Sequence, residues 1–546
     1  MSDEKSLLSR LKQRHVFRVG GMYLVAAWVL LQFAEIMIDF MALPDWTGRA
    51  LIVLVSLGFP FILLLAWVFD VSTNGVKADA ASVGASDQQG ALRKIDSAIV
   101  FMVLLGAGLA FYLWPSEAPD ATGEPEVMLH SPVIEQQNSN KAHHSDKYIL
   151  VGNLVDFTGA SGSSGQAYGQ AIIDANNWIN ENGGINGKLI DLDTIETSYQ
   201  VRRAIDAYEK WSSQGVVAIQ GWGTAIGVAL KDDINADQVP FFSASYSAEF
   251  TDPQGIKTGD AAPYNFFYGP SYSDGCRGLV QWADSDWRTQ GKKMKPKYLH
   301  MGDNQPYPNA PKAACEAYAA ELGFEVLQPI IFSMIPGDYS RQCRLLKASA
   351  PDYVFLANLD KSVSALLTQC SDLEVDTQYM ANIYGFDEDV MLSAGSAANG
   401  LVWVMGAAAW GDSASGMYTV REISKMSDPQ ESKYRSVHYM RGVCSTFYLK
   451  EAIEIANEKN TMNSAAIKQA LYAQAQWVPK GLEGVCLPTT WTEKDHRGVT
   501  KVPIYQARVN GPVTGLSIQS LINNQIIEMT PIYEATIERK PEWLGW

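Results

Sequence analysis

Residues 148–165 read YILVGNLVDFTGASGSSG, and an amphipathic segment follows them directly. The first eight residues form a short apolar run that predicts a strand, and residues 166–182 place Ala171, Ala175 and Ile179 on one face of a predicted helix. Glycines between the two let a ligand approach the backbone, and the free N–H groups of a helix start favour an anionic or polar group. A strand, a glycine-rich turn and a helix in this order predict the opening unit of an α/β fold.

The same alternation continues through most of the chain that follows. Strands are predicted at 148–155, 188–195, 216–220 and 239–244, then at 266–268, 297–301, 325–331, 353–356 and 378–381. Later segments predict helices over 437–457 and 463–473 and then closing strands. The fold class is therefore α/β, with two doubly wound lobes that each contain a parallel sheet. Ligands of such folds bind outside the carboxyl ends of the strands, so two facing lobes predict a cleft.

The first part of the chain has a different composition. Residues 19–43 and 50–69 are apolar and long enough to span a bilayer, for which ~20 residues are needed. Residues 97–114 form a shorter apolar run that ends in aromatic residues. Lys and Arg are concentrated before the first run and between the second and third runs, which places the N-terminus in the cytoplasm and the C-terminal part outside. We expect a cytoplasmic basic N-terminus (1–18), a three-helix anchor in the cytoplasmic membrane (19–114), a flexible linker (115–146) and a two-lobed extracytoplasmic domain (147–546).

Charge and cysteine content limit the function classes. The chain has 546 residues and a net charge of −16, which argues against a nucleic-acid partner because such partners require basic patches. All six cysteines lie after residue 275, where an exported domain permits disulfides. Spacing alone leaves their connectivity open. We expect no metal site and no cofactor.

The motifs of the C-terminal part resemble, in order, those of the leucine/isoleucine/valine-binding family of ABC-transporter solute receptors. The matching stretches include VGNLVDFTGASGSSGQ (151–166), VVAIQGWGTAIGVAL (216–230), VPFFSASYSAEFTDP (239–253), HMGDNQPYPNA (300–310) and YMRGVCSTFYLKEAIEIA (439–456). The resemblance covers about residues 147–510 and implies the type I periplasmic binding fold. It also implies a receptor that captures a small polar organic ligand, amino-acid-like or a carboxylate, for ABC permease subunits. Together with the three apolar runs, this predicts a membrane-anchored receptor. No Ser-His-Asp spacing, HExxH motif or Walker A loop stands out, so we do not expect an enzyme.

The resemblance also implies which residues contact that ligand in the first lobe. Trp222, Gly223 and Thr224 occupy the turn after the third strand, where family members present a small polar residue. The next strand end, which supplies amides and hydroxyls to a ligand carboxylate, is Ser245-Tyr246-Ser247. Thr224 and Ser247 could equally be ordinary helix caps, and Trp222 a core aromatic residue.

Four further positions follow from the same resemblance. Ser164 falls where relatives carry an aromatic residue in the pocket wall, and Tyr307 matches a cleft tyrosine of the second lobe. Relatives that bind amino acids place an acid near a second-lobe strand end, but here the region around Tyr384 has no acid before Asp387. Asp360 could substitute for it. Because an ammonium buried without a counter-charge is costly, we expect a small organic acid or a neutral polar molecule in preference to leucine, isoleucine or valine.

Other interpretations stay open. A ligand-sensing membrane receptor of the same fold, signalling through a partner, is the closest alternative. An enzyme with a dinucleotide-binding lobe is more distant, because the spacing of Gly159, Gly162 and Gly165 departs from GxGxxG. Within the implied fold, Cys343 with Cys370, and Cys444 with Cys486, are the candidate disulfide pairs, since they join elements that are adjacent or return to the same lobe.

Overall fold

A computed structural model of the protein describes residues 147–458 and 463–546, the isolated residues Tyr23, Ala27, Leu30 and Val55, and two short strands near the N-terminus. These strands, β1 (Phe69–Ser72) and β2 (Gly75–Ala78), pair antiparallel. The predicted cytoplasmic N-terminus, three-helix anchor and linker otherwise lie outside the described residues. Within the described part of the chain, no helix combines the length and the apolar character needed to cross a membrane.

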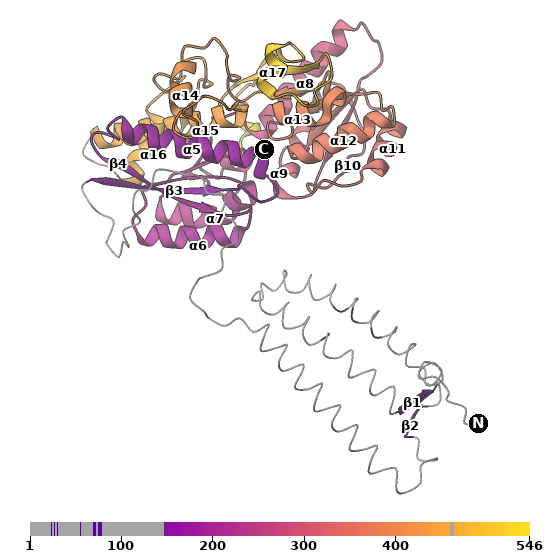
Figure 1. Ribbon diagram of the computed structural model, residues 1–546, viewed down its shortest axis with the longest axis horizontal. Coiled ribbons are helices and arrows are strands. Elements are labelled where there is room, and N and C mark those ends of the chain that lie inside the picture. Colours follow the sequence, from indigo (N-terminus) through magenta and orange to yellow (C-terminus); the bar gives the residue numbers. More distant parts are fainter. Residues whose placement is uncertain are drawn as a thin grey trace. The chain divides into compact units, whose positions relative to one another are not determined.

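The first lobe contains a five-stranded parallel sheet in the order β4-β3-β5-β6-β7. Its strands are β3 (Tyr148–Val155), β4 (Leu189–Glu196), β5 (Ala218–Gly221), β6 (Phe241–Ser243) and β7 (Asn265–Phe266). Helices α6 (Val201–Ser213) and α7 (Thr224–Asp237) lie on one side of the sheet, and α5 (Gly162–Glu181) lies on the other (Figure 1). Because helices cover both faces, seven of the eight residues of β3 are buried.

The second lobe contains an eight-stranded sheet in which β10, β8, β11, β12, β13, β16 and β17 are neighbours in that order and β9 pairs with β8. Its strands are β8 (Lys297–Gly302), β9 (Glu325–Val326), β10 (Ile330–Ile331), β11 (Tyr353–Ala357), β12 (Gln378–Ala381), β13 (Val402–Val404), β16 (Lys501–Val509) and β17 (Ile527–Thr536). The helices of this lobe are α8 (Tyr272–Thr289), α9 (Pro306–Asn309), α10 (Lys312–Glu321), α11 (Ser340–Ser349), α12 (Asp360–Asp372), α13 (Glu388–Ala394) and α17 (Ile518–Asn523).

Two predictions for this sheet need correction. The strand expected over 325–331 is two short strands, because Pro329 between them has no N–H to donate to a ladder. The sheet is also mixed rather than wholly parallel, since β16 runs antiparallel to both β13 and β17. The prediction of parallel strands is confirmed for β8 to β13.

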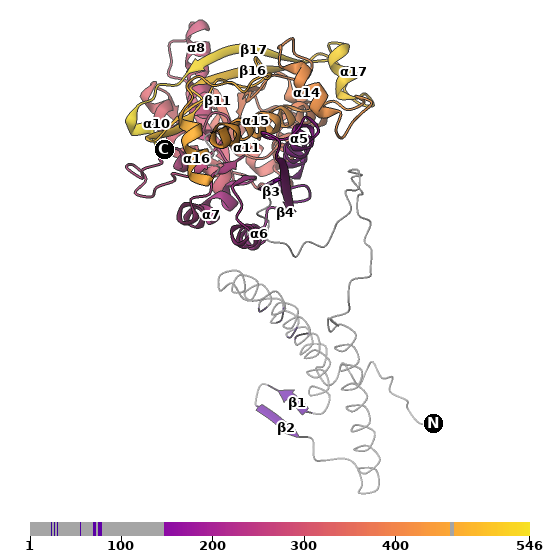
Figure 2. The ribbon, with the colours of Figure 1, turned by 90° about the vertical axis from the view of Figure 1, so that its left-hand side faces the viewer.

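The chain passes between the lobes three times. It leaves the first lobe after β7, returns after β13, and leaves again before β16. The returning segment forms α14 (Met417–Ser424), α15 (Val437–Glu458), α16 (Ser464–Tyr472), β14 (Thr490–Thr492) and β15 (Asp495–Gly498). Helix α15 packs along α5, on the side of the first sheet opposite α6 and α7 (Figure 2). The hydroxyl of Tyr268 donates to the carbonyl of Gly406 at 2.8 Å and thereby joins two of the crossings.

The six cysteines form three disulfides. The predicted pairs Cys343–Cys370 and Cys444–Cys486 are both confirmed, and Cys276–Cys315 is a third pair that the sequence did not predict. Cys276–Cys315 and Cys343–Cys370 join helices of the second lobe, while Cys444–Cys486 lies in the part of the chain that returns to the first. Each disulfide therefore stiffens one lobe and leaves the lobes without a covalent bridge besides the three crossings.

Candidate functional site

A small cavity lies between the lobes, at the carboxyl ends of the strands. It is lined by Ser161, Tyr199, Trp222, Gly223, Thr224 and Ala244 of the first lobe, by Tyr272 at a crossing, and by Tyr307, Leu359 and Tyr384 of the second lobe. Its volume is about 10 Å³, which is room for about one water molecule. Side chains of the protein therefore fill the predicted cleft in this conformation.

The turn after β5 forms the first-lobe wall as predicted. Gly223 has a φ of 93°, and a Cβ atom there would lie 2.8 Å from the Tyr199 ring, so only glycine suits the position. The Trp222 indole donates to the Ser161 hydroxyl at 2.7 Å, which fixes the ring at the edge of the cavity. The Ser245 hydroxyl donates to that of Thr224 at 2.9 Å, at the start of α7. The first lobe thus offers one flat aromatic face and a pair of hydroxyls.

Two tyrosines form most of the second-lobe wall. Tyr384 follows β12, and its hydroxyl donates across the boundary to the carbonyl of Ala244 at 2.5 Å. Its ring centroid lies 5.0 Å from that of Trp222. The Tyr307 hydroxyl lies 3.1 Å from the Asn358 carbonyl and 2.9 Å from the Asn382 amide oxygen, so its polar contacts stay within the second lobe.

The glycine-rich loop differs from the expectation of a free anion site. The carboxylate of Asp156 accepts from the amide of Gly159 at 2.6 Å and from the amide of Ser161 at 3.1 Å, so the chain's own acid satisfies these donors. A Cβ atom at Gly165 would lie 2.1 Å from the Asp156 carbonyl oxygen, so this glycine allows the helix to pack closely on the loop. The prediction that the loop glycines open the backbone to a ligand is therefore wrong for Gly165.

Ser164 and Asp360 meet across the boundary between the lobes. The hydroxyl of Ser164 donates to the Asp360 carboxylate at 2.9 Å, and the Ser163 hydroxyl donates to the same oxygen. Burial, together with the nearby Asp387 carboxylate, raises the pKa of Asp360 above its usual value. In this conformation Asp360 thus covers the first turn of α5.

The structure brings together most, but not all, of the predicted site residues. Trp222, Gly223, Thr224, Tyr307 and Tyr384 line the cavity. Tyr246 lies buried behind Tyr384, with 5.8 Å between their ring centroids. Ser247 does not line the cavity, because its hydroxyl turns to the carboxylate of Glu249 at 2.9 Å.

Sequence reasoning missed several residues of the cavity. Tyr199 lines it, and Tyr199 and the preceding Ser198 have φ values of 61° and 48°, a strained conformation for residues other than glycine. Burial raises the pKa of Tyr199 to about 12. Tyr199 follows the carboxyl end of β4, so the rule that ligands bind at the ends of parallel strands could have found it.

Arg441 and His438, both on α15, lie beside the aromatic residues and were also missed. The Arg441 guanidinium lies over two rings, 4.4 Å from the centroid of Tyr384 and 4.9 Å from that of Tyr246. Its Nη1 lies 2.7 Å from Nδ1 of His438. Burial and the neighbouring Arg441 lower the pKa of His438 to about 3, so the imidazole is neutral and its Nδ1 accepts from Arg441. The signal in the sequence was a single arginine in the otherwise apolar run YMRGVCSTFYL.

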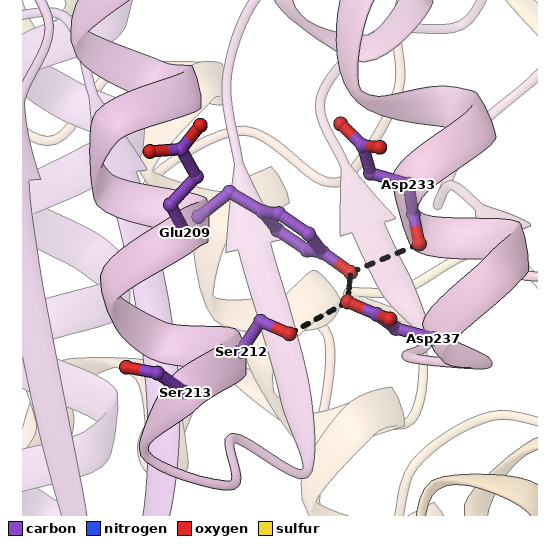
Figure 3. A pocket seen from close by; sticks show the side chains of 6 residues that line it. Glu209, Ser212, Ser213, Asp233 and Asp237 are labelled. Carbon is purple, nitrogen blue, oxygen red and sulfur yellow. Dashed lines mark hydrogen bonds between the residues drawn. The ribbon is translucent and has the colours of Figure 1, made fainter.

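A second hollow lies on the outer face of the first lobe, between α6 and α7 (Figure 3). It has a volume of about 390 Å³ and is lined by Tyr208, Glu209, Ser212, Ser213, Asp233 and Asp237. The hydroxyls of Tyr208 and Ser212 bind the Asp237 carboxylate at 2.9 and 2.6 Å, so the polar groups at its centre already satisfy one another. This hollow lies away from the strand ends and has no wall from the second lobe. The cavity between the lobes is therefore the better candidate for the ligand site.

Two α/β lobes, joined by three crossings and meeting at the carboxyl ends of their strands, define the architecture of a two-lobed solute receptor. A family model described as "Periplasmic binding protein" matches residues 149–512. The chain therefore belongs to the periplasmic binding protein family. A search of curated protein sequences found no match.

Solved structures with the same fold cover most of the two-lobed part. A substrate-binding protein of an ABC transporter from Aeropyrum pernix has 24% identity and a TM-score of 0.62, with 73% of this chain and 98% of that chain covered. A branched-chain amino acid ABC transporter protein from Thermus thermophilus, with bound valine, has 19% identity, a TM-score of 0.62 and coverages of 72% and 97%. A fatty acid ABC transporter substrate-binding protein from Thermomonospora curvata has 16% identity, a TM-score of 0.58 and coverages of 71% and 92%. At these identities the likeness establishes the fold.

Proposed function

We propose that the protein is a solute-binding protein that captures a small polar organic molecule, amino-acid-like or a carboxylate, between its lobes and presents it to an ABC permease. The observation that carries the proposal is the cavity at the strand ends, with walls supplied by both lobes. Membership of the periplasmic binding protein family supports it. So do the structures of similar fold, among them one with bound valine and one of a fatty acid ABC transporter substrate-binding protein. This is a binding role and not an enzymatic one.

The residues at the boundary suit a ligand with one polar end and one flat apolar part. The Thr224 hydroxyl, which accepts from Ser245 at 2.9 Å at the start of α7, can donate to a polar acceptor of the solute. Trp222 and Tyr384 provide aromatic faces that can enclose an apolar body. Each wall holds one of these aromatic residues, so the ligand contacts both lobes at once.

Entry of the solute requires the lobes to separate by a hinge motion. Closure is held by hydrogen bonds that cross the boundary, from Tyr384 to Ala244 and from Ser163 and Ser164 to Asp360. Opening breaks these bonds, together with the one from Tyr434 to Glu388 and the 3.5 Å contact of Arg441 with the Ile383 carbonyl. It exposes both walls, while each disulfide stays within one lobe. The second lobe then covers the bound solute with Tyr307 and Tyr384.

We also propose that residues 19–114 anchor the protein in the cytoplasmic membrane with residues 147–546 outside. The apolar runs and the distribution of Lys and Arg in the sequence support this topology. A reporter that is active only outside the cytoplasm should work when fused after Lys147 and fail when fused at Ala85. Activity at Ala85 with silence after Lys147 would mean the reverse orientation.

The solute can be identified by native mass spectrometry of the full chain as purified, and its affinity then measured by calorimetry. Trp222→Ala should weaken binding at least thirty-fold, because a central aromatic contact contributes about 2 kcal/mol or more. Trp410→Ala is the matched control, since Trp410 stacks on Arg421 and does not line the cavity. Equal affinity of wild type and Trp222→Ala, for a solute that binds stoichiometrically, would place the site elsewhere.

A further inference from the structure

Arg441 is a buried charge without an acidic partner. Its side chain is fully buried, and none of the ion pairs among the described residues involves it. Nη1 is bound to His438, but Nε and Nη2 have no hydrogen-bond partner. Stacking on Tyr246 and Tyr384 satisfies the faces of the guanidinium and leaves these N–H groups, which lie in its plane, unpaired.

Three hydroxyls around Arg441 are unsatisfied in the same way. The hydroxyl oxygens of Tyr168, Tyr246 and Ser445 are buried and have no hydrogen-bond partner. They form one neighbourhood, because Tyr168 interacts with Tyr246, Ser445 and Arg441, and Arg441 with Tyr246. Buried polar groups are almost always paired, so five converging donors without a hydrogen bond of good geometry favour a common acceptor.

Arg435 lies six residues before Arg441 and serves as the comparison. It is a buried arginine with a structural role. Its Nε donates to the Ser424 hydroxyl at 2.7 Å, and its Nη2 donates to the Ser424 carbonyl and the Ser427 hydroxyl at 3.0 and 2.8 Å. The Asp174 carboxylate lies 3.7 Å away and supplies the counter-charge. Burial alone therefore does not explain the unpaired groups of Arg441.

We propose that Arg441, Tyr168, Tyr246 and Ser445 form an anion subsite that binds the carboxylate of the solute. This inference rests on the proposed function and narrows the solute class to small carboxylates with a flat apolar body. Tyr384 covers the subsite in the closed conformation, with its ring 4.4 Å from the guanidinium and its hydroxyl bound to Ala244. Because Tyr384 belongs to the second lobe, opening removes this cover and leaves Arg441 and Tyr246 facing the cleft beside Trp222. The guanidinium then pairs with the carboxylate, and the three hydroxyls donate to its oxygens.

The binding test uses the full chain and matched pairs of probes: acetate and acetamide, benzoate and benzamide, phenylacetate and phenylacetamide. Each pair has nearly the same shape and differs in charge. At least one carboxylate should bind thirty-fold or more tightly than its amide, and Arg441→Gln should abolish that preference, because loss of one partner of a buried charge pair has an effect of this size. Arg435→Gln should keep the preference.

The outcomes separate this inference from the proposed function. Binding of amides as tightly as carboxylates, or a preference that survives Arg441→Gln, would overturn the anion subsite and leave solute binding intact. Failure of every probe, together with a purified chain that carries no solute by native mass spectrometry, would overturn both.

A second test needs no ligand. Arg441→Met should leave the unfolding temperature of the solute-free chain unchanged or raise it, because an apolar side chain of similar volume replaces an uncompensated buried charge. Arg435→Met should lower it by several degrees, because it leaves the Asp174 carboxylate without its counter-charge. A fall for Arg441→Met as large as that for Arg435→Met would make Arg441 a structural residue.

Discussion

Arg435 and Arg441 are six residues apart, and the surroundings of the two differ in how completely their polar atoms are paired. Around Arg435, the Asp174 carboxylate accepts from Gln170 at 2.8 Å, from Ser427 at 2.6 Å and from Tyr439 at 2.7 Å. Around Arg441, two guanidinium nitrogens and three hydroxyls have no partner. The first cluster ties α5 to the start of α15, and the second lies where those helices meet the other lobe. Both clusters are buried, so burial does not distinguish them. They differ in whether their polar atoms are hydrogen-bonded: the bonded cluster stabilises the fold, and we assign the other to the solute.

The largest expected effect is the loss of stability on removing Asp174, the acceptor at the centre of the cluster around Arg435. Asp174→Ala leaves Arg435 and the hydroxyls of Ser427 and Tyr439 without their shared acceptor. Removing one member of a buried ion pair costs about 3–5 kcal/mol. The free energy of unfolding from urea titration should fall by that amount, while affinity for the co-purified solute stays the same. A loss below about 1 kcal/mol would show that the pairing around Arg435 is not structural.

A smaller effect concerns pH and the boundary between the lobes. Burial, with Asp387 nearby, raises the pKa of Glu388 from 4.5 to about 8, and its carboxylate accepts from the Tyr434 hydroxyl at 3.0 Å. The folded chain thus holds a proton that the unfolded chain releases above pH 4.5, so stability falls as pH rises through this range up to about 8.

The window from pH 6.5 to 8 lies above the pKa of about 6 of the neighbouring Asp387 and Asp389, and comparison with Glu388→Gln isolates Glu388 from the other buried acids. The buried His300, His438 and His496 have pKa values lowered from 6.5 to about 3, so they change stability in the opposite direction and only below pH 6.5. The free energy of unfolding of the wild type should fall by about 1–2 kcal/mol between pH 6.5 and 8, and that of Glu388→Gln should fall much less. Parallel curves of unfolding temperature against pH for the two proteins would contradict this assignment.

The smallest effect compares two serines, one from each cluster. The Ser427 hydroxyl donates to Asp174 at 2.6 Å and accepts from Arg435 at 2.8 Å, whereas that of Ser445 has no partner. Ser427→Ala should lower the free energy of unfolding by about 1–2 kcal/mol, and Ser445→Ala should leave it unchanged within about 0.5 kcal/mol. Equal losses in thermal unfolding of the two variants would remove the distinction between the clusters.

The elements that sequence predicted well are those set by local pattern. The strands at 148–155 and 378–381 have the predicted bounds, because an apolar run between turn residues determines where each strand begins and ends. The turn at Trp222, Gly223 and Thr224 followed from the resemblance to a known family, and the structure places it at the edge of the sheet where parallel strands end. Two disulfides followed from the resemblance to a known family, because it implied which elements are adjacent or return to the same lobe.

The features of the site that could not be predicted from the sequence depend on residues that are far apart in the chain. Whether the donors of the glycine-rich loop are free depends on the rotamer of Asp156, which satisfies two of them. The unpaired state of Arg441 depends on side chains from α5, the turn after β6 and α15, and no single segment shows that Tyr168, Tyr246 and Ser445 converge. Even the cover of this cluster, Tyr384, comes from the other lobe.

The location of the solute is tested most directly by a crystal structure of the full chain with the solute that mass spectrometry identifies. We predict electron density between the lobes, in contact with Trp222 and Tyr384 and with an anionic group within hydrogen-bond distance of Arg441. Density in the outer hollow beside Tyr208 and Asp237, with the cleft between Trp222 and Tyr384 still filled by side chains, would contradict the proposed site.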